Sequence, residues 1–346
     1  MTDLAEALLG WYDQAKRILP WRDRFDPYKV WVSEIMLQQT RVDTVIPYYE
    51  RFMEAFPNVK ALSEAEESVY LKLWEGLGYY SRVRNLVKGA KMVQDVYHGV
   101  IPETKKELMA IPGIGDYTAS AILSFAFGER TVTVDGNLIR VYARLAGDAI
   151  VPNEESSKKA CYDFFLPHID ESNSRDFNQA LMDLGELVCL PNGNPKCLSC
   201  PLSKYCRAYK EGKQTSYPLP KKKIEKKIEH RVVFALLYRN KVALFKRTNK
   251  GLLSGMYEYL NVIDENRLDP KLLLEKENIP CKSLISLGKA KHVFTHLVWE
   301  MEGYACVVDQ PLEGVIFATK NDLLNTFALP NAFAYFTKIL CDDYLK

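Results

Sequence analysis

The stretch Ile111-Pro112-Gly113-Ile114-Gly115-Asp116-Tyr117-Thr118-Ala119, followed by Val134-Asp135-Gly136-Asn137, predicts a helix-hairpin-helix with a carboxylate behind it. Thr104-Lys-Lys-Glu107 is a capping pattern that starts one helix, and residues 117–127 carry a second helix of apolar periodicity. Between them, Gly113 and Gly115 can take positive φ and let another backbone approach. The free N–H groups at the start of the second helix then form a clamp for one phosphate. An ordinary turn between two helices has the same pattern, so the surrounding sequence must decide.

Length and composition favour two domains. The 346 residues are about twice the usual domain size, and the 47% hydrophobic content supports a sizeable core in each. Apolar runs fall short of the roughly 20 residues of a membrane span, and Met1-Thr-Asp-Leu-Ala-Glu lacks the features of a signal peptide. We therefore expect a cytoplasmic protein in a reducing compartment, with no membrane partner.

The net charge of +2 hides an uneven distribution. Residues 210–231 carry eight basic and three acidic side chains, with the run Lys221-Lys222-Lys223-Ile-Glu-Lys226-Lys227 at its centre. Such a run is either a solvated linker or a segment that lies beside a polyanion. Charge alone neither supports nor excludes a nucleic-acid partner.

The periodicity of the sequence changes near residue 231. Residues 1–209 predict a helical domain, 210–230 a basic linker rich in Lys, Pro, Ser and Gly, and 231–346 a smaller α/β domain. Residues 231–238 and 241–246, separated by Arg239-Asn240, predict a β-hairpin, and 293–299 and 303–308 predict two further strands.

Four of the eight cysteines lie in one short window. They are Cys189, Cys197, Cys200 and Cys206, with seven, two and five residues between them. Without a secretion signal, this pattern favours a metal over disulfides. Both a zinc ion and an iron–sulfur cluster can be held by four thiolates, so the spacing leaves these two open. The others are isolated and are expected to be small buried apolar side chains: Cys161, Cys281, Cys306 and Cys341.

The hairpin, Asp135 and the cysteine loop resemble, in their order and separation, the endonuclease III superfamily of DNA glycosylases. In that superfamily the loop binds a [4Fe–4S] cluster, so the resemblance implies this cofactor with the four clustered cysteines as ligands. The superfamily usually has six residues between its first two cysteines, whereas this chain has seven. A loop rich in Pro, Gly and Asn can absorb one extra residue.

Four further motifs resemble the adenine DNA glycosylases of the MutY type. They are Leu19-Pro-Trp-Arg22, Val32-Ser-Glu-Ile-Met-Leu-Gln-Gln-Thr40, Gly76-Leu-Gly-Tyr-Tyr-Ser-Arg82 and Asn178-Gln-Ala180 to Gly185, and they span nearly all of the helical part. Bifunctional members of the superfamily have a lysine at the start of the second hairpin helix, whose amine attacks the sugar. This chain has Tyr117 there, so the resemblance implies a monofunctional enzyme in which water attacks.

Glu34 is the carboxylate that the resemblance assigns to acid and base chemistry. Glu34, Leu37 and Gln38 fall on one face of the expected helix. Thr40-Arg-Val-Asp43 looks like a capping signal, so the helix is expected to break near Gln39 and leave Gln38 and Gln39 free to reach into a duplex. Without the resemblance, a lone helical glutamate would be taken for a surface carboxylate.

By family analogy, Glu34 protonates adenine at N7 and later activates the water, while Asp135 stays ionised and stabilises an oxocarbenium-like sugar. A glutamate of reference pKa about 4.3 can act as an acid near neutrality only if burial raises its pKa. Glycosidases that act on sugars use the same division between two carboxyls. Asp135 could also serve only as the N-cap of a helix at 137–146.

The resemblance also places residues around the substrate. Adenine is expected beside Trp21, Arg22, Leu37 and Gln179, with Tyr117 and Asn137 near the sugar and the water. Some relatives use Glu in place of Gln179, but an amide can also bind an adenine edge. DNA contacts are expected from Gln38, Gln39, Tyr79, Arg82, Gly113 and Gly115, with Gln39 and Tyr79 inserted when the base leaves the stack.

Residues 231–346 resemble the Nudix-like domain of this family, including its signature Gly251-Leu-Leu-Ser-Gly-Met-Tyr-Glu258. The Glu-rich helix of a working Nudix hydrolase does not occur in this sequence, so we expect a lesion-recognition module. In relatives a Phe-Ser-His loop contacts 8-oxoguanine, and the matching residues are Phe294, Thr295 and His296. In an apolar strand, His296 could instead be a satisfied core histidine.

Three functions follow from these patterns. The first is a base excision repair glycosylase that removes adenine opposite 8-oxoguanine or guanine in double-stranded DNA, acting as a monomer at a bacterial nucleoid. The second, a bifunctional pyrimidine glycosylase and lyase, is disfavoured by Tyr117. The third, a non-catalytic lesion-binding protein, is disfavoured because Glu34 and Asp135 occur together.

Overall fold

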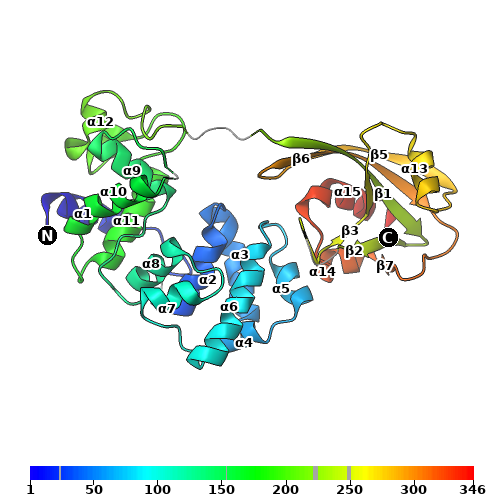
Figure 1. Ribbon diagram of the computed structural model, residues 1–346, viewed down its shortest axis with the longest axis horizontal. Coiled ribbons are helices and arrows are strands. Elements are labelled where there is room, and N and C mark those ends of the chain that lie inside the picture. Colours follow the sequence, from blue (N-terminus) through cyan, green and yellow to red (C-terminus); the bar gives the residue numbers. More distant parts are fainter. Residues whose placement is uncertain (23–24, 153, 221–224, 248–250) are drawn as a thin grey trace. The chain divides into compact units, whose positions relative to one another are not determined.

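The computed structural model describes residues 1–22, 25–152, 154–220, 225–247 and 251–346. Lys221, Lys222 and Lys223 of the expected basic linker therefore lie outside the described residues. Contacts divide the chain into one unit of residues 1–64 and 84–222 and a second unit of residues 65–83 and 223–346, which are drawn in Figure 1. In the described ranges, no helix has the length and apolar character that crossing a membrane requires.

The first unit is built of helices. In chain order they are α1 (Asp3–Ala15), α2 (Pro27–Leu37), α3 (Val42–Ala55), α4 (Val59–Ser63), α6 (Ser81–Tyr97), α7 (Lys105–Ala110), α8 (Asp116–Phe125), α9 (Gly136–Ala146), α10 (Glu155–Phe165), α11 (Ser174–Leu187) and α12 (Arg207–Lys210). The first residues of α6 belong to the second unit. Short 3-10 turns occur at Leu166–His168, Cys197–Ser199 and Ser203–Tyr205.

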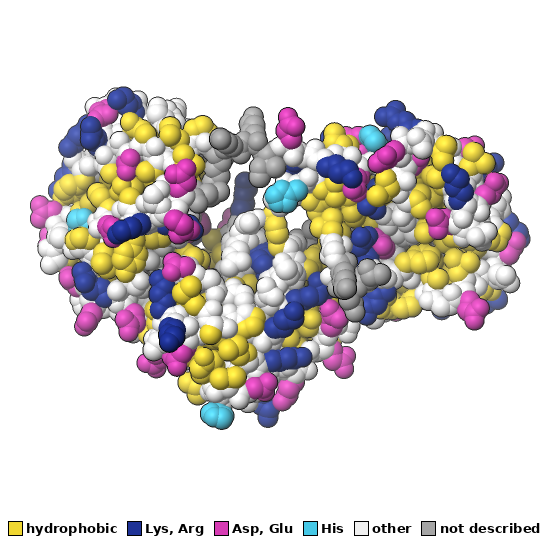
Figure 2. All heavy atoms as spheres, in the orientation of Figure 1, with side chains coloured by type: hydrophobic (Ala, Val, Ile, Leu, Met, Phe, Trp, Pro, Cys, Tyr) yellow, Lys and Arg dark blue, Asp and Glu magenta, His cyan; other side chains and the backbone are white. Residues whose placement is uncertain are grey.

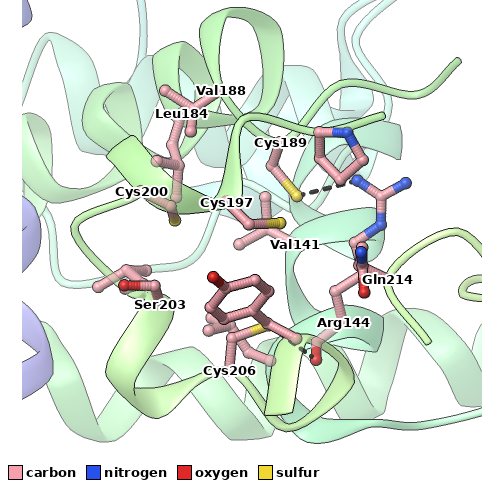
Figure 3. A pocket seen from close by; sticks show the side chains of 14 residues that line it. Val141, Arg144, Leu184, Val188, Cys189, Cys197, Cys200, Ser203, Cys206 and Gln214 are labelled. Atoms are coloured by element: carbon pink, nitrogen blue, oxygen red, sulfur yellow. Dashed lines mark hydrogen bonds between the residues drawn. The ribbon is translucent and has the colours of Figure 1, made fainter. Parts of the chain in front are cut away.

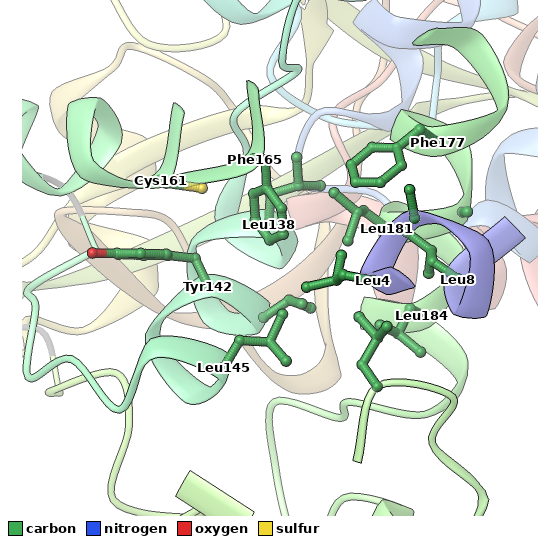
Figure 4. Close-up of a cluster of buried hydrophobic side chains, with 14 of the residues drawn as sticks. Leu4, Leu8, Leu138, Tyr142, Leu145, Cys161, Phe165, Phe177, Leu181 and Leu184 are labelled. Carbon is green, nitrogen blue, oxygen red and sulfur yellow. The ribbon is translucent and has the colours of Figure 1, made fainter. Parts of the chain in front are cut away.

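One hydrophobic core joins α1 to α9, α10 and α11 (Figure 4). Its large members are Leu4, Leu8, Leu138, Leu145, Phe165, Phe177, Leu181 and Leu184. Burying one such side chain stabilises the fold by roughly 1.5–3 kcal/mol. This core therefore fixes α9 and α11, which carry several of the expected site residues.

A glycine lets α9 and α11 come close together. A Cβ built at Gly185 of α11 would lie 2.8 Å from the Cβ of Asn137 in the first turn of α9. Any larger residue at this position would push the two helices apart. Gly185 thus allows the start of α9 to lie against α11.

The predicted helix-hairpin-helix is present, with one correction. Thr104 caps α7 by accepting a 3.3 Å hydrogen bond from the Glu107 N–H, and Gly113 in the hairpin has φ +85°. Gly115 does not take positive φ, because it is the extended N-cap of α8 with φ −94° and ψ −177°. No atom lies within 4 Å of the position its Cβ would occupy, so Gly115 leaves open space in front of the helix start.

The second unit contains a mixed sheet. Its strands are β1 (Lys227–Tyr238), β2 (Lys241–Lys246), β3 (Tyr257–Glu258), β4 (Leu260–Ile263), β5 (Ser283–Val293), β6 (Leu297–Val307) and β7 (Ile316–Ala318). The main order is β3-β2-β1-β6-β5, with β4 paired to β1 and β7 paired to β2. Its helices are α5 (Glu67–Leu73), α13 (Pro270–Lys276), α14 (Lys320–Asn325) and α15 (Ala334–Ile339), and α15 continues as a π-helical turn at Leu340–Tyr344.

Strand β1 builds a core on each face of this sheet, because its side chains alternate. Val233, Ala235 and Leu237 belong to a core that contains Phe336 of α15, whereas Val232, Phe234 and Leu236 belong to one that contains Leu273 and Leu274 of α13. The predicted hairpin is confirmed, since Tyr238 of β1 pairs with Lys241 of β2.

Two predictions for the second unit were wrong. Of the strands expected at 293–299 and 303–308, residue 293 instead ends β5 and residues 294–296 form a turn. Residues 297–299 and 303–307 belong to the single strand β6, which runs without a break through 300–302. Along β6, Met301 and Gly303 are buried while Glu300 and Glu302 are more exposed. Cys281 and Cys306 are not isolated but are paired as a disulfide, since antiparallel pairing of β5 with β6 brings their segments together.

Residues 65–83 lie within the helical part of the sequence but pack in the second unit. Lys72 of α5 donates to the Glu75 carboxylate (2.5 Å) and to the carbonyl oxygens of Leu323 (2.9 Å) and Phe327 (3.1 Å). These two carbonyls lie at the C-terminal end of α14, where a cation is favourable. Glu75 accepts from the Leu329 N–H at 2.7 Å. This ion pair therefore fastens residues 65–83 to the C-terminal part of the chain.

Candidate active site

Glu34 lies on α2 and is almost completely buried, with 4% of its surface exposed. The helix begins with Asp26 as N-cap, which accepts from the Tyr28 N–H at 2.8 Å, and with Pro27 in its first turn. It ends at Leu37, so the predicted break near Gln39 is confirmed and Gln38 lies beyond the last turn. The next helix starts after Arg41, not at the expected Thr40 cap, because the Thr40 hydroxyl donates to the Gln38 carbonyl instead.

Tyr117 contacts Glu34 directly. Its hydroxyl donates a 2.6 Å hydrogen bond to Oε2 of Glu34. Burial raises the pKa of Glu34 to about 7, while this hydrogen bond lowers the pKa and the charge of Asp135 raises it. Burial also raises the pKa of Tyr117, which therefore keeps its proton and acts as the donor. Glu34 is thus a carboxyl group that can exchange a proton near neutral pH.

Asp135 is the N-cap of α9. Its Oδ1 accepts from the Leu138 N–H at 2.8 Å, and its Oδ2 accepts from Nδ2 of Asn137 at 3.0 Å. Burial raises the pKa of Asp135 to about 6, while these bonds and the positive charge of Arg140 lower it. The capping role expected as an alternative is real. It does not exclude a second role, because the positive end of the helix also stabilises the carboxylate.

Asn178 of α11 positions the segment before Asp135. Its Oδ1 accepts from the N–H of Thr133 at 3.0 Å, and its Nδ2 donates to the carbonyl of Thr131 at 2.8 Å. All hydrogen bonds of this amide are buried. A buried amide that satisfies two backbone groups is costly to replace. Asn178 therefore fixes the backbone that leads into Asp135.

Glu34 lines a pocket together with all four residues expected around adenine. The pocket encloses about 50 Å³ of free space, or about 450 Å³ when the open solvent at its mouth is counted. Trp21, Arg22, Leu37 and Gln179 line it, and Trp21 packs edge-on against Tyr49 with ring centroids 5.2 Å apart. Segments around residue 20, α2 and α11 thus contribute to one cavity. The family resemblance implied this grouping without its geometry.

Several residues that line this pocket or hold its lining side chains were missed by the sequence analysis. Asp183 is completely buried and accepts from Nη1 (2.8 Å) and Nη2 (3.1 Å) of Arg22 and from Nε of Arg17 (2.9 Å). Arg17 also donates to Glu186 at 2.8 Å, and Tyr12 donates to Gln179 at 2.7 Å. Asp183 follows Gln179 by four residues on α11, a spacing that could have indicated a shared face.

The expected DNA-contacting residues fall into different surroundings. Gln39 is exposed with φ +58°, and Tyr79 is 49% exposed with φ +47°. Positive φ is uncommon for residues other than glycine and often occurs at functional sites. Arg82 is partly buried and donates to the carbonyls of Leu77 and Gly78, so part of its guanidinium stabilises its own turn. The Gln38 amide donates to the Thr118 hydroxyl at 3.5 Å.

Phe294, Thr295 and His296 form the turn between β5 and β6. The Phe294 N–H donates to the Leu297 carbonyl at 2.8 Å, and the Phe294 ring packs against Trp299 at 4.8 Å. His296 is exposed, so it is not a core histidine. The Thr295 hydroxyl lies 3.2 Å from the hydroxyl of Tyr79, which belongs to the same unit.

The four clustered cysteines line one cavity in the first unit, which encloses about 30 Å³ of free space (Figure 3). Arg144 of α9 donates from Nη1 to the sulfur of Cys189 (3.1 Å), and Cys206 donates to the Arg144 carbonyl (3.3 Å). Arg140 donates to the Cys189 carbonyl at 2.8 Å and to Asn137 at 2.8 Å, which links the cysteine loop to the start of α9. Within the described ranges, no three His, Cys, Asp or Glu side chains form a group that could hold a metal ion.

Charges of both signs are mixed over the face drawn in Figure 2. This distribution agrees with the small net charge of +2. Neutral donors such as the N–H groups at the start of α8 can bind a phosphate without a basic side chain.

Two family matches cover most of the chain. Residues 32–165 match the HhH-GPD superfamily of base excision DNA repair proteins, and residues 232–338 match the NUDIX domain. A solved thermostable thymine-DNA glycosylase is 30% identical with a TM-score of 0.55, over 60% of this chain and 95% of that chain. A trapped endonuclease III–DNA covalent intermediate is 23% identical with a TM-score of 0.52, over 60% of this chain and 95% of that chain, and supports the fold alone.

Curated relatives match over most of this chain. The adenine DNA glycosylase of Buchnera aphidicola subsp. Baizongia pistaciae (strain Bp) is 38% identical over 84% of this chain and 82% of that protein. The protein of the same name from Homo sapiens is 32% identical over 91% of this chain and 69% of that protein, and that from Arabidopsis thaliana is 36% identical over 84% and 55%. Together with the helix-hairpin-helix and the pocket around Glu34, these matches show that the chain belongs to the adenine DNA glycosylase family of base excision repair enzymes.

Proposed function

We propose that this enzyme hydrolyses the N-glycosidic bond of adenine paired with 8-oxoguanine or guanine, and that it does so without lyase chemistry. The observation that carries the proposal is the environment of Glu34. This buried carboxyl has a pKa raised to about 7 and lines the same pocket as Trp21, Arg22 and Gln179. A proton donor that works near neutral pH therefore lies in the wall of the pocket where we propose that the extruded base binds.

The first step of the proposed reaction is proton transfer from Glu34 to N7 of adenine. The protonated base is a better leaving group, and the C–N bond breaks with the development of an oxocarbenium-like sugar. The carboxylate of Glu34 then takes a proton from water as the oxygen attacks the sugar carbon. Each turnover returns Glu34 to its protonated state, because the proton taken from water replaces the one given to adenine.

Asp135 is proposed to stay ionised and to stabilise the positive sugar. Its pKa of about 6 lies below that of Glu34, so a range of pH exists in which Glu34 is protonated and Asp135 is not. Tyr117 and Asn137 hold the two carboxyls through hydrogen bonds of 2.6 and 3.0 Å. We infer that they also bound the space for the sugar and the water.

DNA is proposed to bind through the hairpin before α8 and through two exposed side chains. The free N–H groups at the start of α8 are suited to one phosphate. Gly115 leaves open space for the strand, whereas Gly113 supplies the positive φ of the hairpin and makes room for Asn85. Gln39 and Tyr79 are proposed to insert into the duplex when the adenine is extruded. Their positive φ values support this role, because strained backbone at an exposed residue is otherwise disfavoured.

The cysteine cavity is proposed to hold a [4Fe–4S] cluster. Four cysteines of one short loop line one space, and the Arg144 guanidinium beside Cys189 would stabilise a thiolate. In the described residues their sulfurs do not form a metal-binding group, and Cys206 donates to the Arg144 carbonyl, so binding the cluster would require these side chains to turn toward one another. The cluster would be bound by Cys189, Cys197, Cys200 and Cys206, and it would supply structure and support for DNA contact. No step of base removal is assigned to it.

The turn at 294–296 is proposed to contact 8-oxoguanine opposite the adenine. Thr295 is exposed and its hydroxyl lies 3.2 Å from the Tyr79 hydroxyl, so both side chains would belong to one surface that contacts the lesion. Thr295→Val removes the hydroxyl and keeps the branched shape. We expect this variant to lose preference for A:8-oxoguanine over A:G duplexes, measured as the ratio of the two base-release rates. An unchanged ratio would remove Thr295 from lesion recognition.

The proposed function is tested by single-turnover base release. The purified protein is incubated with A:8-oxoguanine and A:G duplexes, and the product strand is split with alkali. We expect Glu34→Gln to bind DNA as the parent does while base release falls by about 10²–10⁴-fold. Full activity of Glu34→Gln would refute its role. Borohydride trapping separates the lyase alternative, since a covalent adduct would require an attacking amine.

A further inference from the structure

The amide of Gln179 is oriented before any base enters the pocket. The Tyr12 hydroxyl donates to its Oε1 at 2.7 Å, and both side chains are buried. Burial raises the pKa of Tyr12 to about 12, so the phenol stays a donor at neutral pH. Across the described part of the chain, no group accepts a hydrogen bond from Nε2 of Gln179. Its two N–H donors therefore remain for the contents of the pocket.

Arg22, which lines the same pocket, is also held by a buried partner. Two of its nitrogens donate to the two oxygens of Asp183, at 2.8 and 3.1 Å, in a paired geometry that fixes the plane of the guanidinium. A guanidinium has donors and no acceptor. Gln179 and Arg22 therefore both offer N–H groups from this part of the pocket wall.

We propose that Tyr12 is a positioning residue for base recognition, which turns the Gln179 amide so that its N–H donors face the extruded base. This inference deepens the proposed function and rests on it. On the edge that carries N1, adenine offers a ring acceptor to such a wall, whereas guanine has N1–H and a 2-amino group, which would face donors. The N7 edge does not give this preference, because guanine accepts there through both O6 and N7. Tyr12 thereby contributes to the choice of adenine over guanine without touching the base.

A double-mutant cycle tests the proposal. The parent, Tyr12→Phe, Gln179→Leu and the double variant are compared in single-turnover release from an A:8-oxoguanine duplex. Tyr12→Phe keeps the ring in the core and removes only the hydroxyl, and we expect release to be about tenfold slower. In the Gln179→Leu background the same change is expected to have no further effect, because Tyr12 acts through the amide. The proposal would be overturned if the double variant slowed release by the product of the two single effects, or if Tyr12→Phe left the release rate unchanged.

Base analogues separate positioning from a general structural effect. Adenine is replaced in the duplex by 1-deazaadenine or 3-deazaadenine, each of which exchanges one ring acceptor for C–H. For one of these analogues the Tyr12→Phe effect is expected to disappear, because the amide has no acceptor to meet. An equal slowing for adenine and both analogues would overturn the positioning role. The parent protein serves as the reference: if it releases no adenine, the proposed function itself fails, and if it does, the result concerns Tyr12 alone.

Discussion

Tyr117 donates a 2.6 Å hydrogen bond to Oε2 of Glu34, and this bond favours the ionised form of the carboxyl. Burial acts in the opposite direction and is the larger effect, so the pKa of Glu34 is raised to about 7. The position that holds an attacking lysine in bifunctional relatives thus holds a phenol that adjusts the acid. Tyr117 therefore moderates the pKa that burial raises in Glu34.

The pH dependence of base release should have two limbs. Release needs Glu34 protonated and Asp135 ionised, and their pKa values are raised to about 7 and about 6. We expect kcat/KM to be greatest between these values and to fall by about tenfold for each pH unit well above 7. Measurements from pH 5 to 9 on one A:8-oxoguanine duplex would check this. A flat profile over this range would contradict the assignment of the acid.

Tyr117→Phe should move the alkaline limb. The hydrogen bond from Tyr117 lowers the pKa of Glu34, so its removal is expected to raise that pKa and shift the limb to higher pH. The phenyl ring keeps most of the packing volume. The same pH series on parent and variant measures the shift, and a limb that stays in place would show that another group titrates there.

The free energy of unfolding should also depend on the ionisation of the buried Glu34 carboxyl. The folded-state pKa of Glu34, about 7, lies above its unfolded value of 4.5, so its contribution to stability is complete below pH 4.5 and is lost as the pH rises through 7. Glu34→Gln cannot ionise. The free energy of unfolding of the variant, relative to that of the parent, is therefore expected to be higher at pH 8, by at most about 3 kcal/mol, and not at pH 4.5. Denaturant melts of parent and variant at both pH values measure this.

Glu171→Gln is the matched control for that comparison, because Glu171 is exposed. The difference in free energy of unfolding between Glu171→Gln and the parent is expected to be the same at pH 4.5 and pH 8. If Glu34→Gln were less stable than the parent at pH 8, the cost of burying the Glu34 charge would be smaller than the value of its bond to Tyr117.

The two hairpin glycines should respond differently to alanine. Gly113 has φ +85° and a Cβ there would lie 2.9 Å from the Cβ of Asn85, so Gly113→Ala is expected to lower stability by about 1–2 kcal/mol. Gly115 has ordinary φ and open space, so Gly115→Ala is expected to keep its melting temperature. It should still weaken DNA binding, because the methyl group lies where a phosphate would approach. Unaltered DNA affinity in Gly115→Ala would argue against the clamp.

The metal site can be tested by colour. An iron–sulfur protein is brown with a broad visible absorption band, and Cys200→Ser should lose this band together with thermal stability, because a ligand is removed. Cys161→Ala is the control, since Cys161 is buried in the core and does not line the cysteine cavity. A colourless parent that contains stoichiometric zinc would mean that the ligands are right and the metal is wrong.

The sequence predicted the features that depend on local pattern or on a motif. The capping of α7 by Thr104, the break after Leu37 and the β1–β2 hairpin follow from residue types at short spacing. The pocket residues came from the resemblance, and the structure gathers them around Glu34. Features that depend on a distant partner were missed. Asp183 carries no local sign that it holds two arginines, since Arg17 and Arg22 lie more than 160 residues away.

The wrong predictions arose where the surrounding structure overrode a local sequence pattern. Both hairpin glycines can take positive φ, but only Gly113 does, because Gly115 is the extended N-cap of α8. The break expected within β6 came from two glutamates, which simply occupy the more exposed positions of an alternating strand. The pairing of Cys281 with Cys306 depends on strand register, which composition does not reveal.

The packing of residues 65–83 in the second unit limits how this enzyme can be divided. A gene cut at the linker would leave Lys72 and Glu75 without the backbone groups of Leu323, Phe327 and Leu329. It would also leave Tyr79 without Thr295. Exchange of the C-terminal part for that of a relative would place residues 65–83 against a different set of partners.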